Sequence, residues 1–207
     1  MSSIAANLPT IVTPRELLKN MIPRLYVTVD LKFGARFAAE ERTAHYLKNV
    51  MRRVAGDAVI LFNGRDGEFT ATLADVSKKS VEIDVGDLRR PQAGVPDVWL
   101  CFAPLKKDAV DFLVEKATEL GVAAFQPVFT KHTAATRLNL ERLAANAIEA
   151  AEQTERLTLP LIRAPLSLAD LIQGWDPARR IILCAEAGPA LPIGEALSKL
   201  KSDVRQT

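Results

Sequence analysis

The chain has 207 residues, of which 48% are hydrophobic and 25% are charged. This composition is typical of a globular protein and argues against disorder over most of the chain. The formal net charge of +2 predicts no generally basic surface, so any contact with nucleic acid has to be local. We find no apolar run that could span a bilayer and no secretory signal, and we therefore expect a cytoplasmic protein.

Motifs for several common chemistries are missing from the sequence. Cys101 and Cys184 sit in the apolar runs VWLCFA and IILCAEA, which predicts two buried core residues and neither a disulfide nor a zinc site. The two histidines, His45 and His132, fall in different predicted domains, so we expect no metal site. There is also no glycine-rich phosphate loop and no nucleophile elbow.

The N-terminal part of the chain has the pattern of a small β-barrel. After an expected loose extension over residues 1–20, short alternating strands fill residues 24–85, with a tight turn at 63–67 (NGRDG). Strands at this spacing leave no room for crossover helices, which favours a barrel. One helix, 40–54, interrupts them and is expected to face the core with Ala44, Leu47, Met51 and Val54.

The other side of this helix is basic. No acid falls between Arg42 and Arg53, and this face carries Arg42, His45, Lys48, Asn49, Arg52 and Arg53. Such a stripe offers the charge and the donors that phosphate contacts need, but a solvated basic face explains it equally well. Lys78 and Lys79 extend the stripe only if the fold brings their hairpin close.

A linker is expected next, because residues 87–97 are rich in proline and glycine. Beyond it, buried strands alternate with amphipathic helices, which implies a parallel sheet covered on both sides. The predicted elements are a strand at 98–103, a helix at 107–120 that Gly121 ends, a strand at 122–130, helices at 139–156 and 167–174, a strand at 181–185 and a helix at 191–200.

The helix over 139–156 carries a polar line beside its apolar face. Helical spacing aligns Arg142, Asn146, Glu149, Gln153 and Arg156. A solvated face with weak ion pairs is the ordinary interpretation of such a line, and a binding face is the alternative. In parallel sheets, ligands bind beyond the carboxyl ends of the strands, where this chain places Lys106, Lys107, Lys131, His132 and Glu186.

Six segments together resemble one known family. They are IPRLYV, HYLKNVMRRVAGD, LFNGRDGEF, KKSVEI, APLKKDAVDFLVEKATELGV and NLERLAANAIEAAEQTERLTLP. The chain resembles the RsmE family of SPOUT-class methyltransferases, which methylate N3 of a uridine in 16S ribosomal RNA of the small subunit. The resemblance runs in register from Met21 to Thr207.

The resemblance implies a domain plan and a set of partners. It implies an RNA-binding PUA-like β-barrel over 21–90, a linker over 91–97, and an α/β SPOUT domain over 98–207 with a trefoil-knotted parallel sheet flanked by helices. It also implies S-adenosylmethionine (SAM) as cofactor, and a homodimer with its active site at the subunit interface. No membrane or metal partner is expected.

The resemblance also suggests site residues. Glu149, Gln153 and Arg156 are catalytic candidates that would orient the base or the partner subunit. The cofactor would be approached by Leu183, Cys184, Ala185, Glu186 and Gly188. RNA would be held by Arg24, His45, Lys48, Arg52, Arg53, Lys78, Lys79, Lys106, Lys107, His132 and Arg137.

Two departures from the family pattern affect these expectations. Family members continue with IGPEGG-like and LGPRILR-like segments that form the knot and most of the cofactor pocket, whereas this chain ends at Thr207, so we expect weak cofactor binding. Glu155 replaces a small residue, often glycine or serine. Two other hypotheses remain at this point: a non-catalytic RNA-binding module, and a SPOUT methyltransferase acting on transfer RNA.

Overall fold

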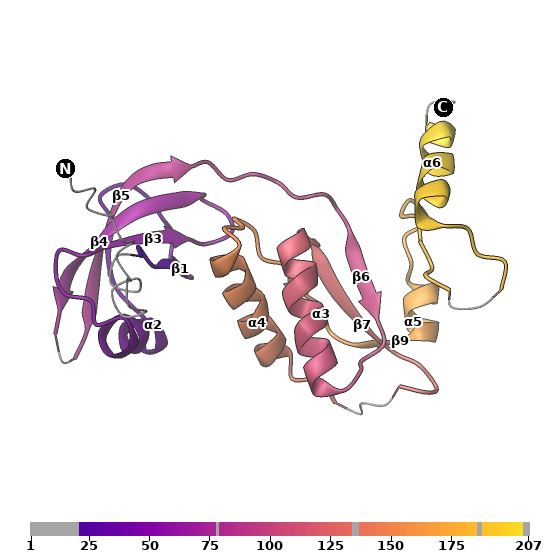
Figure 1. Cartoon of the computed structure of the whole chain (residues 1–207), viewed down its shortest axis with the longest axis horizontal. Coiled ribbons are helices and arrows are strands. Elements are labelled where there is room, and N and C mark those ends of the chain that lie inside the picture. Colours follow the sequence, from indigo (N-terminus) through magenta and orange to yellow (C-terminus); the bar gives the residue numbers. More distant parts are fainter. Residues whose placement is uncertain (1–20, 78, 134–136, 186–187, 205–207) are drawn as a thin grey trace, which may run out of the picture. The chain divides into compact units, whose positions relative to one another are not determined.

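The computed structural model describes residues 21–77, 79–133, 137–185 and 188–204. The chain divides into two compact units, residues 1–168 and residues 169–207. The first unit contains two β-sheets that are separate in sequence, one before and one after the segment 91–98, which has no regular secondary structure (Figure 1).

The first sheet has five strands in the order β1-β3-β4-β5-β2. β1 pairs in parallel with β3, and the other neighbours are antiparallel. β1 and β2 are the two ends of this order, and the described residues show no ladder that closes it. Alternate residues of the strands form one apolar core, which includes Leu25, Leu61, Leu73 and Ile83. The strands are β1 (Arg24–Tyr26), β2 (Arg36–Ala38), β3 (Ala58–Phe62), β4 (Glu68–Val76) and β5 (Val81–Arg90).

The helix expected over 40–54 differs from the prediction in its second half. It consists of α2 (Glu41–His45) followed by a π-helical turn, η1 (Tyr46–Val50). Leu47 and Met51 are buried as predicted, but Val54 is 61% exposed. A π turn holds more residues than an α turn, and the chain then leaves the helix through Arg52 with φ of +54°, so the α-helical spacing no longer places Val54 on the core face.

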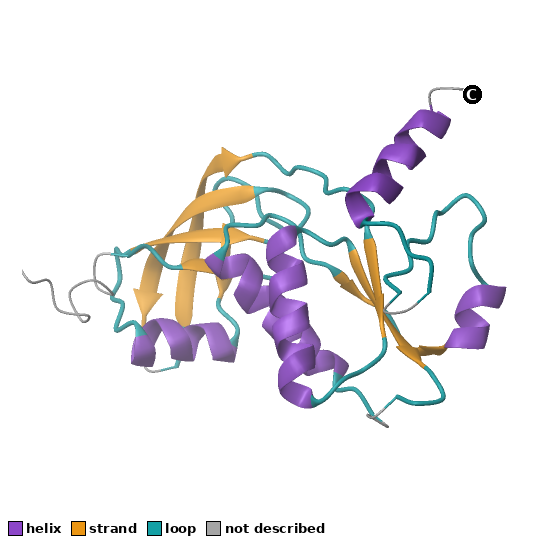
Figure 2. Cartoon of the chain, turned by 45° about the vertical axis from the view of Figure 1, so that its right-hand side comes forward, coloured by secondary structure: helices purple, strands orange, loops and turns teal. Residues whose placement is uncertain are grey.

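The second sheet is parallel, as the alternating pattern predicted. β6 (Trp99–Phe102), β7 (Ala124–Phe129) and β8 (Leu161–Ile162) are neighbours in that order, and β9 (Leu166–Ser167) also pairs with β7. α3 (Lys107–Leu120) and α4 (Leu140–Gln153) lie side by side against this sheet (Figures 1 and 2). Their shared core contains Phe102, Val110, Val114, Phe125, Leu143 and Ala147.

Sequence signals account for the ends of both helices. Gly121 ends α3 with φ of +85°, a conformation that glycine adopts readily. Asn139 begins α4, and its side chain accepts a hydrogen bond from the Arg142 N–H. These boundaries agree with the prediction within a few residues.

Two predictions about buried apolar runs were wrong. Cys101 and Cys184 are both exposed. Cys101 alternates with Leu100 and Phe102, which pack on the helices, so it faces the side of β6 that α3 and α4 do not cover. Residues 181–185 form no strand and are exposed. An apolar run shows that a segment suits a sheet, but it does not show which neighbouring segment covers or pairs with it.

The second unit is mainly helical where it is described. α5 (Leu168–Gln173) begins at the boundary between the units, and α6 (Ile193–Val204) follows, both close to the predicted helices. Between them, the Trp175 indole donates to the Arg179 carbonyl at 2.9 Å. In the part of the chain that is described, no helix is both long and apolar enough to cross a membrane.

Candidate functional site

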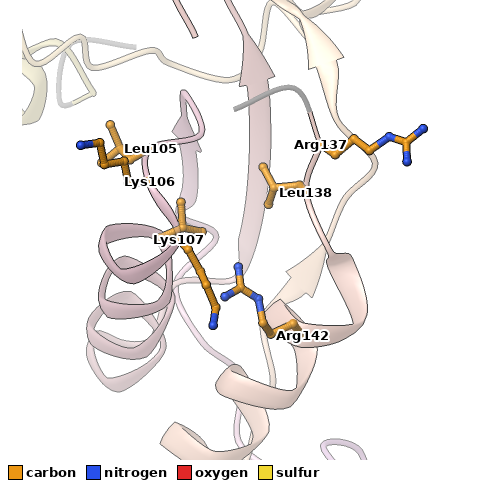
Figure 3. Close-up of a pocket in the computed structure, with 7 residues that line it drawn as sticks. Leu105, Lys106, Lys107, Arg137, Leu138 and Arg142 are labelled. Carbon is orange, nitrogen blue, oxygen red and sulfur yellow. The ribbon is translucent and has the colours of Figure 1, made fainter. Parts of the chain in front are cut away.

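A cationic pocket lies at the start of α3. It has a volume of about 250 Å³ and is lined by Leu105, Lys106, Lys107, Val110, Arg137, Leu138 and Arg142. Figure 3 shows that Lys107 and Arg142 reach toward the same space, whereas the Arg137 side chain points away from it. Lys106, Lys107 and Arg137, three of the residues expected to hold RNA, thus all line the pocket, with the Arg137 guanidinium directed outward from it (Figure 3).

The charges of this pocket favour an anion. Lys106 is the N-cap of α3 and makes no capping hydrogen bond through its side chain, so the first N–H groups of the helix have no such partner. Arg142 is paired with Asp111 at 2.8 Å, but within the described residues no ion pair engages Lys106, Lys107 or Arg137. Several cations beside the positive end of a helix dipole repel one another unless a negative group joins them.

Two other residues expected at this edge of the sheet, Lys131 and the predicted RNA contact His132, do not line the pocket. Lys131 and His132 are exposed in the turn after β7. The turn is closed by the Thr133 hydroxyl, which accepts from the Thr130 N–H at 2.7 Å. Glu186 lies outside the described residues.

The basic face of α2 and η1 divides into structural and exposed groups. Lys48 donates to the Ser77 carbonyl at 2.9 Å, which ties η1 to the β4–β5 hairpin. Arg53 donates to the Met21 carbonyl and lies 3.9 Å from an oxygen of Asp57. These two cations therefore have internal partners in the fold.

The remaining basic residues of this face stay accessible. Arg42, His45 and Arg52 are exposed, and so is Lys79 in the hairpin that Lys48 contacts. The fold thus brings the hairpin close to the stripe, which the sequence alone left open. Lys78 lies outside the described residues.

Arg24 has a structural position in place of the predicted RNA contact. Its side chain is 7% exposed, and its guanidinium bonds Glu68 at 2.6 Å and the carbonyls of Ala151 and Arg156 at 2.8 Å each. It also stacks 3.8 Å from the centre of the Phe62 ring. No open surface remains for a phosphate, so Arg24 joins the first sheet to the end of α4.

Glu68 is the centre of this junction. Its side chain is fully buried, and it accepts hydrogen bonds from Arg24, Arg90 and Arg89, the shortest at 2.6 Å. Burial alone would raise the pKa of Glu68, but the hydrogen bonds from Arg90 and Arg24 outweigh it and lower the pKa. The carboxylate is therefore charged and matched by cations from β1 and β5.

A second carboxylate supports the same junction. Glu152, on α4, accepts a hydrogen bond from the backbone N–H of Tyr26 at 2.9 Å. Burial raises the pKa of Glu152, and the hydrogen bond from Tyr26 offsets only part of this. Sequence reasoning missed Glu68 and Glu152 because their partners are between 21 and 126 residues away in the chain.

The polar residues aligned along α4 and just after it fall into two groups. Glu149 and Gln153 line a second pocket of about 270 Å³ with Asp111, Glu115, Asn146 and Ala150. Arg156 lies apart from this pocket: it donates to the Glu119 carbonyl at 3.3 Å, and its guanidinium occupies the space beside Gly121 that a Cβ there would need. Two of the three catalytic candidates thus share a pocket, and Arg156 connects the ends of α3 and α4.

The expected cofactor segment belongs to the second unit. Leu183, Cys184 and Ala185 are exposed without regular structure, and Gly188 has φ of +92°. These residues line neither of the two pockets described above. By themselves they form no cradle for a ligand, so the described residues do not provide a fitted SAM site.

Comparison with protein families identifies the chain. Residues 92–205, more than half of the chain, match the family described as RNA methyltransferase domain. The chain belongs to this RNA methyltransferase family. Residues 40–86 match a second family, described as RNA methyltransferase PUA domain. The resemblance inferred from the sequence is confirmed, as are the parallel sheet and the PUA domain within the expected fold class.

Curated relatives of this RNA methyltransferase family carry one name. "Ribosomal RNA small subunit methyltransferase E" of Rickettsia conorii is 31% identical over 151 residues, which cover 72% of this chain and 62% of the relative. The protein of the same name from Synechocystis is 30% identical over 167 residues, covering 79% of this chain and 55% of the relative. The chain therefore spans less than two thirds of the length of these relatives.

Two solved structures are similar to this chain in fold. A Legionella pneumophila protein in complex with the cofactor SAM has a TM-score of 0.69 and 24% identity, covering 75% of this chain and 67% of that one. A ribosomal RNA small subunit methyltransferase E from Neisseria gonorrhoeae, bound to S-adenosyl methionine, has a TM-score of 0.66, also at 24% identity, covering 76% and 67%. At this identity the likeness establishes the fold.

Proposed function

We propose that the protein transfers a methyl group from SAM to N3 of a uridine in 16S ribosomal RNA. The observation that carries this proposal is the cationic pocket at the start of α3, which lies inside the segment that matches the RNA methyltransferase domain. The names of the curated relatives support small-subunit ribosomal RNA as the substrate. We also propose that the complete protein contains a SPOUT-type trefoil knot, forms a homodimer and is located in the cytoplasm.

Two cationic surfaces are proposed to hold the RNA. Lys106, Lys107 and Arg137 would bind phosphates at the start of α3, where the helix dipole adds to their charge. Exposed His45, Arg52 and Lys79 would contact the backbone from the PUA domain. His132 stays a candidate at the end of β7. Phosphate contacts of this kind position the RNA, and contacts to the base have to select the uridine.

The chemistry requires that the base be held and its proton removed. Uracil N3 becomes nucleophilic only when it loses its proton, and the base has to lie in line with the methyl group. We propose that Glu149 and Gln153, in the pocket beside Asn146, orient the base or the partner subunit. SAM supplies the electrophilic methyl group. Since the described residues do not form its site, we derive no step through it.

The test uses the complete gene product with unmethylated small-subunit ribosomal RNA and methyl-labelled SAM, followed by digestion and nucleoside analysis. We expect label in 3-methyluridine. Label on a ribose or on guanine would refute the proposal, and preferential labelling of transfer RNA would favour the tRNA hypothesis. RNA binding without any methyl transfer would favour the non-catalytic module.

A matched pair of variants tests the pocket. Lys107→Ala should weaken RNA binding. It should also reduce the slope of log K against log salt by the amount that one phosphate contact contributes, since each contact releases about one counterion. Lys116→Ala, on the same helix but paired with Glu115 and Glu119 at 2.8 Å, should leave both unchanged. Equal effects of the two variants would contradict a role for the pocket.

A further inference from the structure

Phe33 is the most exposed aromatic side chain at the surface of the first unit's N-terminal sheet. It lies in the connection between β1 and β2 and is 75% exposed. A single exposed apolar residue is common at protein surfaces and does not by itself indicate a site. The surroundings of Phe33, however, hold it in one place and give it a particular chemistry.

The connection that carries Phe33 is anchored on both sides. Before it, Leu31 is buried in the core, and its N–H donates to Asp66 at 2.8 Å. After it, the Gly34 N–H donates to the Val85 carbonyl at 2.9 Å. Gly34 has φ of +78°, which allows the sharp turn that leaves the ring outside. An ordered loop tip loses little conformational entropy when a ligand binds to it.

A cation without an ion pair stands next to Phe33 in the chain. Lys32 is exposed, and the described residues provide no acidic partner for it. The nearby carboxylate of Asp30 is paired with Arg65 at 2.7 Å, and Asp84 is paired with Arg36 at 2.5 Å. Arg65 also lies 3.9 Å from Asp66, and Lys32 is the cation next to the ring in the chain that has no ion pair among the described residues.

The neighbours of Phe33 in the chain do not extend its apolar surface. They are a lysine and a glycine, whereas the centre of a protein interface is a contiguous apolar patch. One isolated aromatic ring beside a free cation is the arrangement that binds single-stranded nucleic acid: the ring stacks on a base, and the cation meets the adjoining phosphate.

We propose that Phe33 stacks on an unpaired base of the RNA substrate while Lys32 contacts a neighbouring phosphate. This site lies outside both pockets and precedes the residues 40–86 that match the PUA domain family. It gives the protein a second RNA contact, and this contact requires a single-stranded segment. The inference rests on the proposed function, since it takes RNA as the ligand.

The experiment compares matched aromatic variants of the complete protein. Dissociation constants for a labelled single-stranded fragment of 16S ribosomal RNA are measured by fluorescence anisotropy at several salt concentrations. Phe33→Ala should weaken binding roughly 5- to 150-fold, since one stacked base contributes about 1–3 kcal/mol, and leave the salt slope unchanged. Phe33→Trp should retain affinity. Lys32→Ala should reduce the slope by about 0.7.

Phe112→Ala is the control. Phe112 is an exposed phenylalanine too, at 63%, but it lies on α3. It should bind as the wild type does. The proposal is overturned if Phe33→Ala binds within twofold of the wild type, if Phe112→Ala loses as much affinity, or if Phe33→Ala weakens binding to a fully paired duplex equally. Failure of the proposed function looks different: the wild-type protein then transfers no methyl group to uridine N3 in the labelling assay, whether or not it binds the RNA.

Discussion

Replacing Glu68 by glutamine should remove much of the stability of the junction between the first sheet and α4. Glu68 is fully buried and Arg24 is 7% exposed, so the substitution leaves the Arg24 cation inside the protein without its counter-charge. Breaking a buried pair in this way costs about 3–5 kcal/mol. The lower end applies here, because Arg24 keeps its bonds to the carbonyls of Ala151 and Arg156.

The exposure of the three arginines around Glu68 shows which of them accounts for most of the stability lost in Glu68→Gln. Arg89 and Arg90 are 45% and 38% exposed, so water can solvate them when Glu68 is neutral, and Arg24 accounts for most of the loss. We therefore expect about 3 kcal/mol for Glu68→Gln and less than about 1 kcal/mol for Arg89→Ala.

Urea unfolding at pH 7 provides the measurement, with Asp84→Asn as the control. Asp84 also pairs with an arginine, but this pair is solvent-exposed, so its loss should change the midpoint little. The lowered pKa of Glu68 means that its contribution is present above the unfolded pKa, near 4.3, and is lost as the pH falls through the folded pKa. The difference between wild type and Glu68→Gln should therefore shrink in acid. A loss at pH 7 no larger than that of Asp84→Asn would refute the reasoning.

Three further predictions concern the same end of α4. Glu155 has φ of +56°, so Glu155→Gly should stabilise the protein by about 0.5–1 kcal/mol in urea unfolding, whereas Glu155→Ala should not. Burial raises the pKa of Glu152, so the wild type loses stability as the pH rises through the folded pKa; Glu152→Gln should be more stable than wild type at pH 8 and should lose this pH dependence. Gly121→Ala should lower the free energy of unfolding by more than about 1 kcal/mol, because its φ is positive and its Cβ would displace the Arg156 guanidinium; Gly94→Ala, with open space around it, should be tolerated.

Much of the local structure could be predicted because local signals decide it. Apolar spacing and the glycine at 121 placed α3 correctly, and Asn139 marked the start of α4. The change from short alternating strands to buried strands with helices separated the two sheets. The family motifs are likewise short stretches of consecutive residues, so the amino-acid sequence is enough to recognise the family.

The candidate site was only partly predictable. Lys106 and Lys107 follow a strand, so their place at the sheet edge followed from topology. The structure adds Arg142, which was predicted only for the polar line of α4, to the pocket that Lys106, Lys107 and Arg137 line. Arg24 was misassigned because nothing near it in the sequence shows that Glu68 and the end of α4 surround it. Cys101 was misassigned because an apolar run does not reveal which face of a strand is covered.

The sequence by itself determined where α3 and α4 lie, where α3 ends, and which family the chain belongs to, since these depend on residues close together in the chain. Only the tertiary structure decided which charges are buried and paired and which remain free at the surface. Arg24 meets Glu68 across 44 residues and α4 across more than a hundred. The energy of a charge depends on what surrounds it in space, and that environment exists only after the chain has folded.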